Sequence, residues 1–529
     1  MRIYNGYATA GNFFDIDKVS LCITKVAAGP FRLNICHTMP PLRPISLKSH
    51  SRSILLVILA TLIGFCPVDV EGARQKPKKK TTQSVRKKSS SKSRGTSRKK
   101  TRKRAKVRVR LAPITALTVL RERELGPGIR YLQYRSNGSR PVIVHVLSMD
   151  RTIPGNALRL IKGEDHAMGL ERLSDMAKRY DSTSNNELYG VVNGNFWRAV
   201  RNTMIGPCVI DGEVVEFNQY KHWTSAFIDV QSKVFIDTIA LTGTAKVGGR
   251  SYQLASVNRR SDTGVVVYNS YGGNAIPHVS SKEIEKAFHE AVKDSVFQES
   301  DSTELALTTE LLKNEIARAQ REVNVEYPMV KVRVRYLRSP SVNVPFPCQV
   351  LSVDTGTVKM PLRGAVVSFS RSVLNGNWPR VGDTLTLTYS TSKHNTTRFM
   401  NAVCGTPRLV RNGVAKHEAQ TEGSTGRRFI QDNLARTALG VDRSGNRIVL
   451  AAVRPDRPED GTHGATLQQT AQIMALLGCY DAMNLDGGGS AGMVVGKDHV
   501  FFDGVDPLTR RLGLGVGMVK LSKILRGPR

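Results

Sequence analysis

The residues best suited to chemistry lie near the C-terminus, in the run Asn484-Leu485-Asp486-Gly487-Gly488-Gly489-Ser490. One acid is followed there by three glycines and a hydroxyl. Three consecutive glycines weaken a helix or a strand, so a local requirement must justify them. Close approach of the backbone to a ligand beside a fixed carboxylate would be such a requirement. The alternative is a tight turn with Asp486 at its start.

Regular elements must position this loop. Thr466 is a typical N-cap for a helix that runs to Leu477 and stops at Gly478. Apolar patterns predict strands at residues 437–441 and 447–453 before the loop, and an apolar run follows it at 493–495. Further upstream, the patterns predict a strand at 141–147, an amphipathic helix at 169–180 and a buried strand at 188–193.

The globular body is expected to cover residues 111–529 and to have an α+β fold, with mixed β-sheets and packed helices. Residues 281–325 are long, charged and helical by period, which predicts a helical insertion. Residues 330–390 return to short strands with Gly and Pro turns and are expected to form a small β unit. A chain of 529 residues is too long for one ordinary core.

Charge is concentrated before the body. The formal net charge is +34, and residues 73–110 hold 19 Lys and Arg with no acid. This segment has too few apolar residues to fold, so we predict a disordered polybasic tail. It would bind an anionic polymer or a membrane surface, or else act as a solvated spacer. It contains no aromatic residue for base stacking, so no specific nucleic acid is expected as a partner.

The N-terminal region, residues 1–72, is interpreted as a signal-peptide region. The apolar run at 54–66 is too short to span a membrane with confidence and suits a signal-peptide core, with basic residues before it. Met39 would be a better start for such a signal. The predicted location is therefore secreted, periplasmic or cell envelope; the alternative is a buried or membrane-anchored segment.

The cysteines and acids define no cofactor site. Cys208, Cys348, Cys404 and Cys479 are scattered singly through the body without a CxxC, so buried free thiols are expected. The acids near the glycine loop do not fix a ligand set, and we expect neither a metal nor another cofactor. The sequence leaves the oligomeric state open.

Several ordered motifs of the body resemble the phosphodiester glycosidase family, bacterial type. The similarity spans roughly residues 141–520 without the helical insertion. The matching segments are Val192-Asn193-Gly194-Asn195-Phe196-Trp197, Cys404-Gly405-Thr406-Pro407, Ala435-Arg436-Thr437-Ala438-Leu439-Gly440 and the loop 484–490. The chain departs from the pattern at Arg454-Pro455-Asp456-Arg457, where many relatives have Asp-Gly-Arg.

The resemblance implies a hydrolase that cleaves the glycosidic bond of a sugar-1-phosphodiester of the N-acetylglucosamine-1-phosphodiester type, in envelope or extracellular glycans. Such a reaction needs stabilisation of the phosphate charge and an activated water or nucleophile. Arg436 is the candidate for the phosphate, because a guanidinium matches phosphate oxygens, and Asp486 is the candidate base or nucleophile.

The remaining candidates would bind the anionic substrate. Thr437 would add a hydroxyl, the amides of Gly487, Gly488 and Gly489 an anion nest, and Asn193 and Asn195 would hold sugar hydroxyls or orient the acid. Asn484 and Ser490 complete the expected set. For each the structural alternative stays open: a salt-bridge partner for Arg436, turn residues for the asparagines, and backbone hydrogen bonds for the hydroxyls.

Two other functions remain open. One is a non-catalytic protein that binds anionic glycans or the envelope through the basic tail, which the missing Asp-Gly-Arg favours. The other is a basic protein that compacts nucleic acid, whose binding would be strongly salt-dependent.

Overall fold

The computed structural model describes residues 112–198, 203–259, 261, 264–276, 329–355, 358–455, 457, 459, 461–496, 498–499 and 510–522. These residues belong to the second of the two units of the chain, Ala105–Arg529. The expected signal-peptide region, polybasic tail and helical insertion lie outside the described residues.

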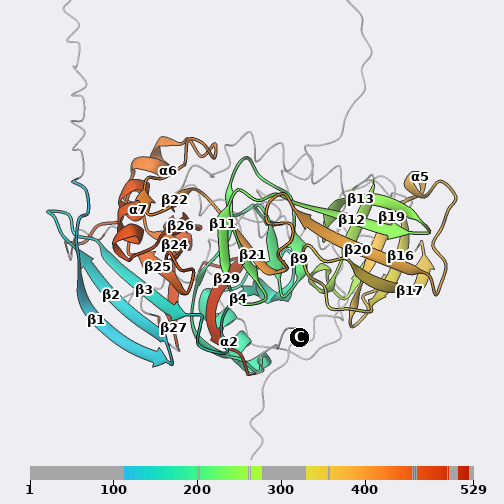
Figure 1. The fold of residues 1–529 in the computed structure, drawn as a ribbon, viewed down its shortest axis with the longest axis horizontal. Helices are drawn as coiled ribbons and strands as arrows, with labels where there is room; N and C mark the ends of the chain where they lie inside the picture. The colour runs from blue at the N-terminus through green and yellow to red at the C-terminus, as the bar shows by residue number, and fades with distance from the viewer. Residues whose placement is uncertain are drawn as a thin grey trace, which may run out of the picture. The chain divides into compact units, whose positions relative to one another are not determined.

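The largest sheet of the described part has eight strands in the order β1-β2-β3-β25-β24-β26-β22-β23. Figure 1 shows β1 to β3, from early in the chain, beside β25 and β24 from its last third. The strands are β1 (Leu117–Gly126), β2 (Ile129–Ser136), β3 (Ile143–Asp150), β22 (Arg408–Arg411), β23 (Val414–Ala415), β24 (Arg436–Val441), β25 (Arg447–Val453) and β26 (Asp481–Asn484).

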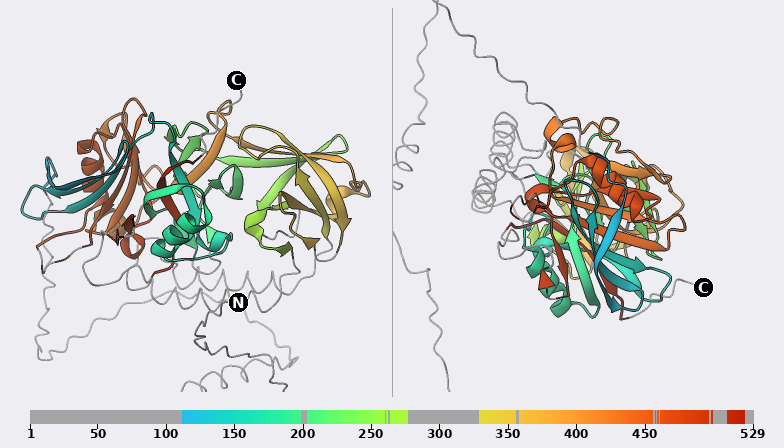
Figure 2. Two further views of the ribbon diagram at one scale, coloured as in Figure 1. Left: turned by 90° about the horizontal axis from the view of Figure 1, so that it is seen from below. Right: turned by 90° about the vertical axis from the view of Figure 1, so that its left-hand side faces the viewer.

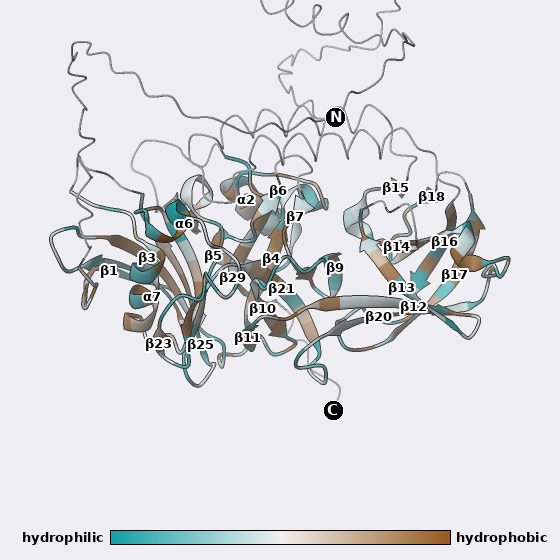
Figure 3. Cartoon of the chain, turned by 90° about the horizontal axis from the view of Figure 1, so that it is seen from above, coloured by the Kyte–Doolittle hydropathy of each residue, from teal (hydrophilic) through white to brown (hydrophobic). Residues whose placement is uncertain are grey.

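Alternation of side chains gives this sheet two buried faces. One face carries Val144, Ala438 and Val449, which pack in a core with α6 (Arg427–Gln431) and α7 (Leu467–Leu476). The other face carries Leu147, Leu439 and Leu450, in a second core shared with the neighbouring sheets. We call these the helix face and the inner face. Strands covered on both faces read as apolar runs, as in β25, and Figure 3 colours such stretches brown.

Two five-stranded sheets contribute to the inner core. One has the order β28-β27-β5-β29-β4 and the other β11-β10-β21-β8-β9. The first contains β4 (Asn156–Lys162), β5 (Glu187–Asn193), β27 (Met493–Val495), β28 (Asp498–His499) and β29 (Leu514–Lys520), with α2 (Leu173–Thr183) packed against it. The second contains β8 (Cys208–Ile210), β9 (Glu213–Glu216), β10 (Thr224–Asp229), β11 (Val234–Asp237) and β21 (Phe399–Gly405).

Seven further strands close into a barrel, which the left view of Figure 2 shows in yellow and green. Its strands are β12 (Leu241–Val247), β13 (Arg250–Val257), β14 (Val265–Tyr268), β16 (Met329–Tyr336), β17 (Phe346–Asp354), β19 (Gly364–Ser370) and β20 (Thr384–Thr391). The segment expected as a small β unit over 330–390 thus supplies four strands, and three more come from residues before the expected insertion.

Short elements complete the described part. They are β6 (Trp197–Arg198), β7 (Thr203–Met204), β15 (Ala275–Ile276), β18 (Val358–Lys359), α5 (Arg371–Leu374) and the 3-10 turns η1 (Gly163–Asp165), η2 (Ser270–Gly272) and η4 (Gly488–Ser490).

The observed architecture corrects the expected α+β class to a mostly β fold. The individual elements around the loop agree with their predictions: α7 begins after a capping box formed by Thr466 and Gln469. The fold class fails because most of the chain between the two predicted helices is strand, and these strands close a barrel that local patterns do not reveal. Among the described residues, no helix is long and apolar enough to cross a membrane.

Candidate active site

The glycine loop leaves β26 and lies between two sheets. The Leu485 amide donates to the Thr437 carbonyl on β24 at 2.8 Å, whereas the Asp486 amide donates to the Gly194 carbonyl after β5 at 3.1 Å. The Gly488 amide then returns to the Ala435 carbonyl at 2.8 Å. The loop is therefore fixed by backbone hydrogen bonds to both the Arg-Thr strand and the Asn-Gly turn, which are far apart in sequence.

Two of the glycines are required by the backbone itself. A Cβ on Gly487 would lie 2.9 Å from the Ala435 carbonyl oxygen, and Gly488 has a φ of +58°. Their amides are already used, because Gly487 donates to Asp486 Oδ1 at 2.9 Å and Gly488 to Ala435. The expected anion nest at Gly487, Gly488 and Gly489 therefore stays a prediction, with two of its three amides bound inside the fold.

Asp486 is a buried carboxylate with few compensating groups. Burial raises its pKa to about 6, against the lowering effects of Arg510, the Ser490 hydroxyl and the Gly487 amide. A carboxyl group with a pKa near 6 exchanges its proton close to neutral pH, which suits acid-base work at a sugar.

Asn193 and Thr437 form a clamp under the acid. Asn193 Nδ2 donates to the Asp486 carbonyl at 2.7 Å, and its Oδ1 accepts from Thr437 Oγ1 at 2.6 Å and from the Gly492 amide at 3.1 Å. Both side chains are almost fully buried. The structure thus brings Asn193, Thr437 and Asp486 together, and the first two side chains make their hydrogen bonds within the fold; their predicted contact with substrate stays a prediction.

Asn195 and Asn484 also serve the scaffold. Asn195 Oδ1 accepts from the Cys404 amide at 3.0 Å, and its Nδ2 donates to the carbonyls of Ile205 and Pro207. Asn484 Nδ2 donates to the carbonyls of Thr406 and Leu485, both at 2.7 Å. Asn484 Oδ1 is a buried acceptor without a hydrogen-bond partner in the described part of the chain. Sugar binding by these two residues stays a prediction.

Arg436 lies on the other side of the sheet from the clamp. In register, Arg436 opposes Val453 of the helix face, while Thr437 opposes Ala452 of the inner face. Its guanidinium is buried and donates to the carbonyls of Ala465, Phe429 and Asp432. Burial lowers its pKa to about 9, and its charged neighbour is Asp432. The structure therefore gives Arg436 a role between β24, α6 and α7, and does not bring it beside Asp486; phosphate binding by Arg436 stays a prediction without support from this geometry.

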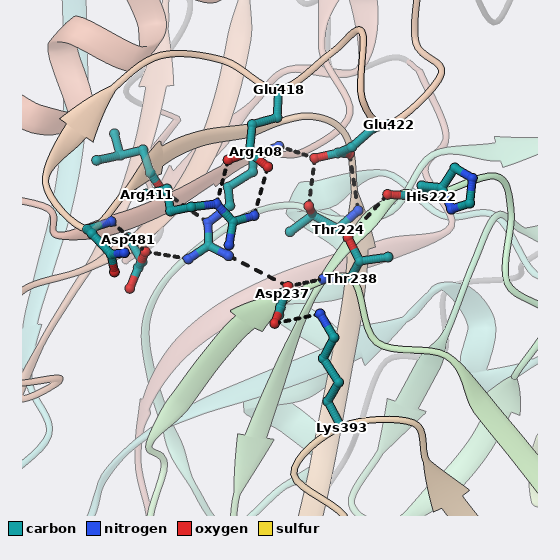
Figure 4. A network of polar contacts seen from close by, with 12 residues as sticks. His222, Thr224, Asp237, Thr238, Lys393, Arg408, Arg411, Glu418, Glu422 and Asp481 are labelled. Carbon is teal, nitrogen blue, oxygen red and sulfur yellow. Dashed lines mark hydrogen bonds and ion pairs between the residues drawn. The ribbon is translucent and has the colours of Figure 1, made fainter.

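A polar network holds the start of β26 in place (Figure 4). Arg408 forms ion pairs with Asp481, the first residue of β26, and with Asp237, the latter at 3.8 Å. The Arg408 amide donates to Glu422 Oε1 at 2.6 Å, and Thr224 donates to the same carboxylate through its amide and hydroxyl. Burial raises the pKa of Glu422, against the effect of these donors. This network joins β10, β11 and β22 to the strand that carries the glycine loop.

Sequence reasoning missed a second polar group on the inner face. Tyr131 Oη and His145 Nδ1 lie 2.9 Å apart, and both side chains are buried. His145 opposes Ala452, which in turn opposes Thr437, so the pair lies in line with the clamp. No local pattern in Tyr131-Leu132-Gln133 singles out this pair, and its place in line with the clamp depends on the pairing of β3 with β25, roughly 300 residues later.

No group of three His, Cys, Asp or Glu residues in the described chain has a geometry that would hold a metal ion. Cys208, Cys348, Cys404 and Cys479 are free and buried, as predicted. Burial raises the pKa of each thiol to about 12, which leaves the thiols protonated and unreactive.

Comparison with known proteins gives a similarity of fold to solved structures and a match to one family. At the level of fold, the chain is similar to a hypothetical protein from Synechocystis, with a TM-score of 0.51 and 19% identity; the alignment covers 74% of this chain and 62% of that one. At the level of family, residues 360–518 match the model of the phosphodiester glycosidase family, which confirms the resemblance and supports a hydrolase at family level. The match includes the Arg-Thr strand and the glycine loop, but not Asn193.

Two other solved structures are more distant. A protein described as exported, from Burkholderia pseudomallei, has a TM-score of 0.49 and 18% identity, covering 72% of this chain and 74% of its own. The catalytic domain of zebrafish N-acetylglucosamine-1-phosphodiester alpha-N-acetylglucosaminidase, auto-inhibited by its pro-peptide, has a TM-score of 0.36 and 12% identity, covering 76% and 87%. A comparison with curated proteins gave no match.

Proposed function

We propose that the chain is an exported hydrolase that cleaves the glycosidic bond of a sugar-1-phosphodiester, of the N-acetylglucosamine-1-phosphodiester type, in envelope or extracellular glycans. The observation that carries the proposal is Asp486: a buried carboxylate on a loop fixed to the Arg-Thr strand and to the Asn-Gly turn, within a segment that matches the phosphodiester glycosidase model.

The chemistry follows from the substrate. The bond between the sugar C1 and the bridging oxygen breaks, water supplies the new hydroxyl at C1, and the phosphate leaves as a monoester. The transition state resembles an oxocarbenium ion, so a carboxylate near C1 stabilises it, as a base toward water or as a nucleophile. We assign this role to Asp486, and we assign to Asn193 and Thr437 the positioning of its loop.

The other predicted partners belong to the same proposal. An anionic glycan or sugar phosphate would be the substrate, and residues 73–110 would hold the enzyme near an anionic polymer or membrane surface by charge attraction. N-terminal sequencing of the exported protein tests the location: a new terminus near residue 73 supports export, and an uncleaved chain in the cytoplasm contradicts it.

Replacement of Asp486 by Asn tests the catalytic proposal. Asn keeps an acceptor for the Gly487 amide but cannot act as base or nucleophile, so turnover of an N-acetylglucosamine-1-phosphodiester should fall by at least about 1,000-fold. Asp354→Asn, at the exposed end of β17, is the matched control and should keep full activity. A folded Asp486→Asn enzyme with wild-type turnover would refute the assignment.

The second candidate is a non-catalytic protein that binds anionic glycans. One observation favours it: Arg436, Asn193 and Asn195 are all bound within the fold. In that case the wild-type protein turns over no sugar phosphodiester, and Asp486→Asn binds anionic glycan as well as the wild type does.

A further inference from the structure

Two leucines are exposed side by side at one rim of the barrel. Leu337 follows the end of β16 and is 53% exposed, and Leu362, in the turn before β19, is fully exposed. The Tyr336 amide donates to the Arg363 carbonyl at 3.1 Å, so the chain just after β16 lies beside this turn. β16 and β19 are neighbouring strands of the barrel (Figure 1). Two large apolar side chains therefore meet water at one place on the surface.

Hydrogen bonds and packing fix the backbone of this rim. The Leu337 amide donates to the Pro347 carbonyl of β17 at 3.0 Å. The Tyr336 ring packs edge to face against Phe346, with ring centroids 5.5 Å apart, and its hydroxyl donates to Glu213 at 3.2 Å. Tyr336 thus anchors the rim to the barrel core, and the leucine beside it is held on the surface by ordered strands.

The shape of this surface favours a lipid bilayer over a folded partner. Single apolar side chains are common on protein surfaces, but neighbouring ones favour association because each leaves water on binding. Leu362 is fully exposed in a turn, so it projects from the fold and lines no groove. A projecting apolar tip enters the boundary between headgroups and acyl chains without a shaped pocket, whereas a folded partner would have to provide one.

The charge around the leucines has one sign. Arg335, Arg338 and Arg363 are exposed beside them. The segments that form the rim, residues 333–339, 345–351 and 358–364, contain no Asp or Glu. Each Lys or Arg close to an anionic membrane surface strengthens binding by about fivefold. We call Leu337, Leu362 and these three arginines the leucine rim.

We propose that the leucine rim binds the surface of an anionic lipid bilayer, with Leu337 and Leu362 inserted and the three arginines on the lipid phosphates. Stable attachment to a membrane generally takes two signals, such as an apolar anchor and a polybasic segment. The sequence of residues 73–110 is polybasic and supplies the second signal. This inference concerns attachment and does not depend on the proposed catalytic activity.

Vesicles of mixed phosphatidylcholine and phosphatidylglycerol test the proposal with the full chain. Leu337→Ser combined with Leu362→Ser should weaken vesicle binding by about tenfold or more, because two apolar side chains no longer leave water. The control is Trp378→Ser with Val381→Ser, a second exposed apolar pair between α5 and β20, beyond the other end of β19. The control should bind as the wild type does. Equal affinities in all three proteins, or equal losses in both variants, overturn the proposal.

The polybasic segment is present in every variant, so a second measurement reports insertion of the rim itself. In Leu362→Trp, vesicle binding should shift tryptophan emission to shorter wavelength, and brominated lipid should quench it. Val414→Trp, at an exposed position on β23, is the control and should show neither effect. The same emission change in both proteins, or in neither, shows that the leucine rim does not enter the bilayer and overturns the proposal.

A soluble anionic polysaccharide distinguishes a lipid from a glycan as the occupant. The leucine variant and the wild type should bind this polymer equally well, because it offers no apolar interior. If the variant loses affinity for the polysaccharide while its vesicle binding is unchanged, the leucine rim is a glycan site and the assignment to lipid is wrong.

Discussion

Replacing Asp486 by Asn should stabilise the protein above pH 6 while it removes activity. The folded protein holds the pKa of this carboxyl at about 6, against an ordinary value of 3.8. Because the folded-state pKa is raised, the unfolded chain releases the proton first, and stability falls as the pH rises from about 4 to about 6. Above that window the charged, buried acid costs a constant free energy of about 3 kcal/mol, from 1.36 kcal/mol per pKa unit.

An Asn side chain carries no charge to desolvate, so most of this cost disappears. The gain should be about 1–3 kcal/mol at pH 8, after allowance for weaker hydrogen bonds to Gly487 and Ser490. Urea unfolding of both proteins at pH 4, 5, 6, 7 and 8 measures it. The difference in free energy of unfolding should vanish near pH 4 and reach its full value above pH 6.

Asp442 provides a control of opposite sign. Burial acts to raise its pKa, but hydrogen bonds from Ser444, Arg447 and Asn446 together lower it. Asp442→Asn should therefore destabilise the protein at neutral pH, and the loss should shrink as the pH falls through the folded-state pKa. If Asp486→Asn gives no gain at pH 8, or a gain that does not change with pH, the carboxylate is not desolvated as described.

Three further outcomes test the site and its support. The kcat/KM for a sugar phosphodiester should rise through an acid limb with a midpoint near pH 6 if Asp486 acts ionised, and a fall above pH 6 would make it the general acid instead. Asn193→Ala should cost about 2–3 kcal/mol in urea unfolding and lower kcat, because the Thr437 hydroxyl and the Gly492 amide lose their acceptor; an unchanged kcat would contradict a positioning role. Arg408→Met should lower the free energy of unfolding by about 3–5 kcal/mol by leaving Asp481 beside an uncharged partner, and a change below about 1 kcal/mol would show that the network does not hold β26.

The sequence predicted those secondary-structure elements that are determined by residues close together in the chain. The capping box at Thr466, the stop at Gly478 and the apolar runs of β5 and β25 depend on neighbouring residues, and these elements were predicted close to their bounds. The glycine loop was identified for the same reason. Gly488 has a positive φ, which favours glycine, and the Ala435 carbonyl lies too close to Gly487 for a larger side chain.

Local patterns do not show long-range pairing. Arg436 and Thr437 are adjacent in sequence and were both predicted at the substrate; alternation sends them to opposite faces of β24, and phosphate binding by Arg436 stays a prediction. The barrel was missed because residues 269–328 separate β12 to β14 from β16, β17, β19 and β20 in the sequence, and local patterns do not show that the two groups of strands pair. The Tyr131–His145 pair lies in line with the clamp because β3 pairs with β25, and no local pattern specifies that pairing.

The measurement that tests the central claim most directly is hydrolysis of the methyl diester of N-acetylglucosamine 1-phosphate by the full chain in ¹⁸O-labelled water. The phosphate monoester is the product to analyse, because its oxygens do not exchange with water, whereas the anomeric oxygen of the released sugar does. A monoester without ¹⁸O shows cleavage between C1 and oxygen, as a glycosidase with Asp486 near C1 predicts. One ¹⁸O in the monoester shows attack at phosphorus, and the assignment of Asp486 to the sugar carbon would then be wrong.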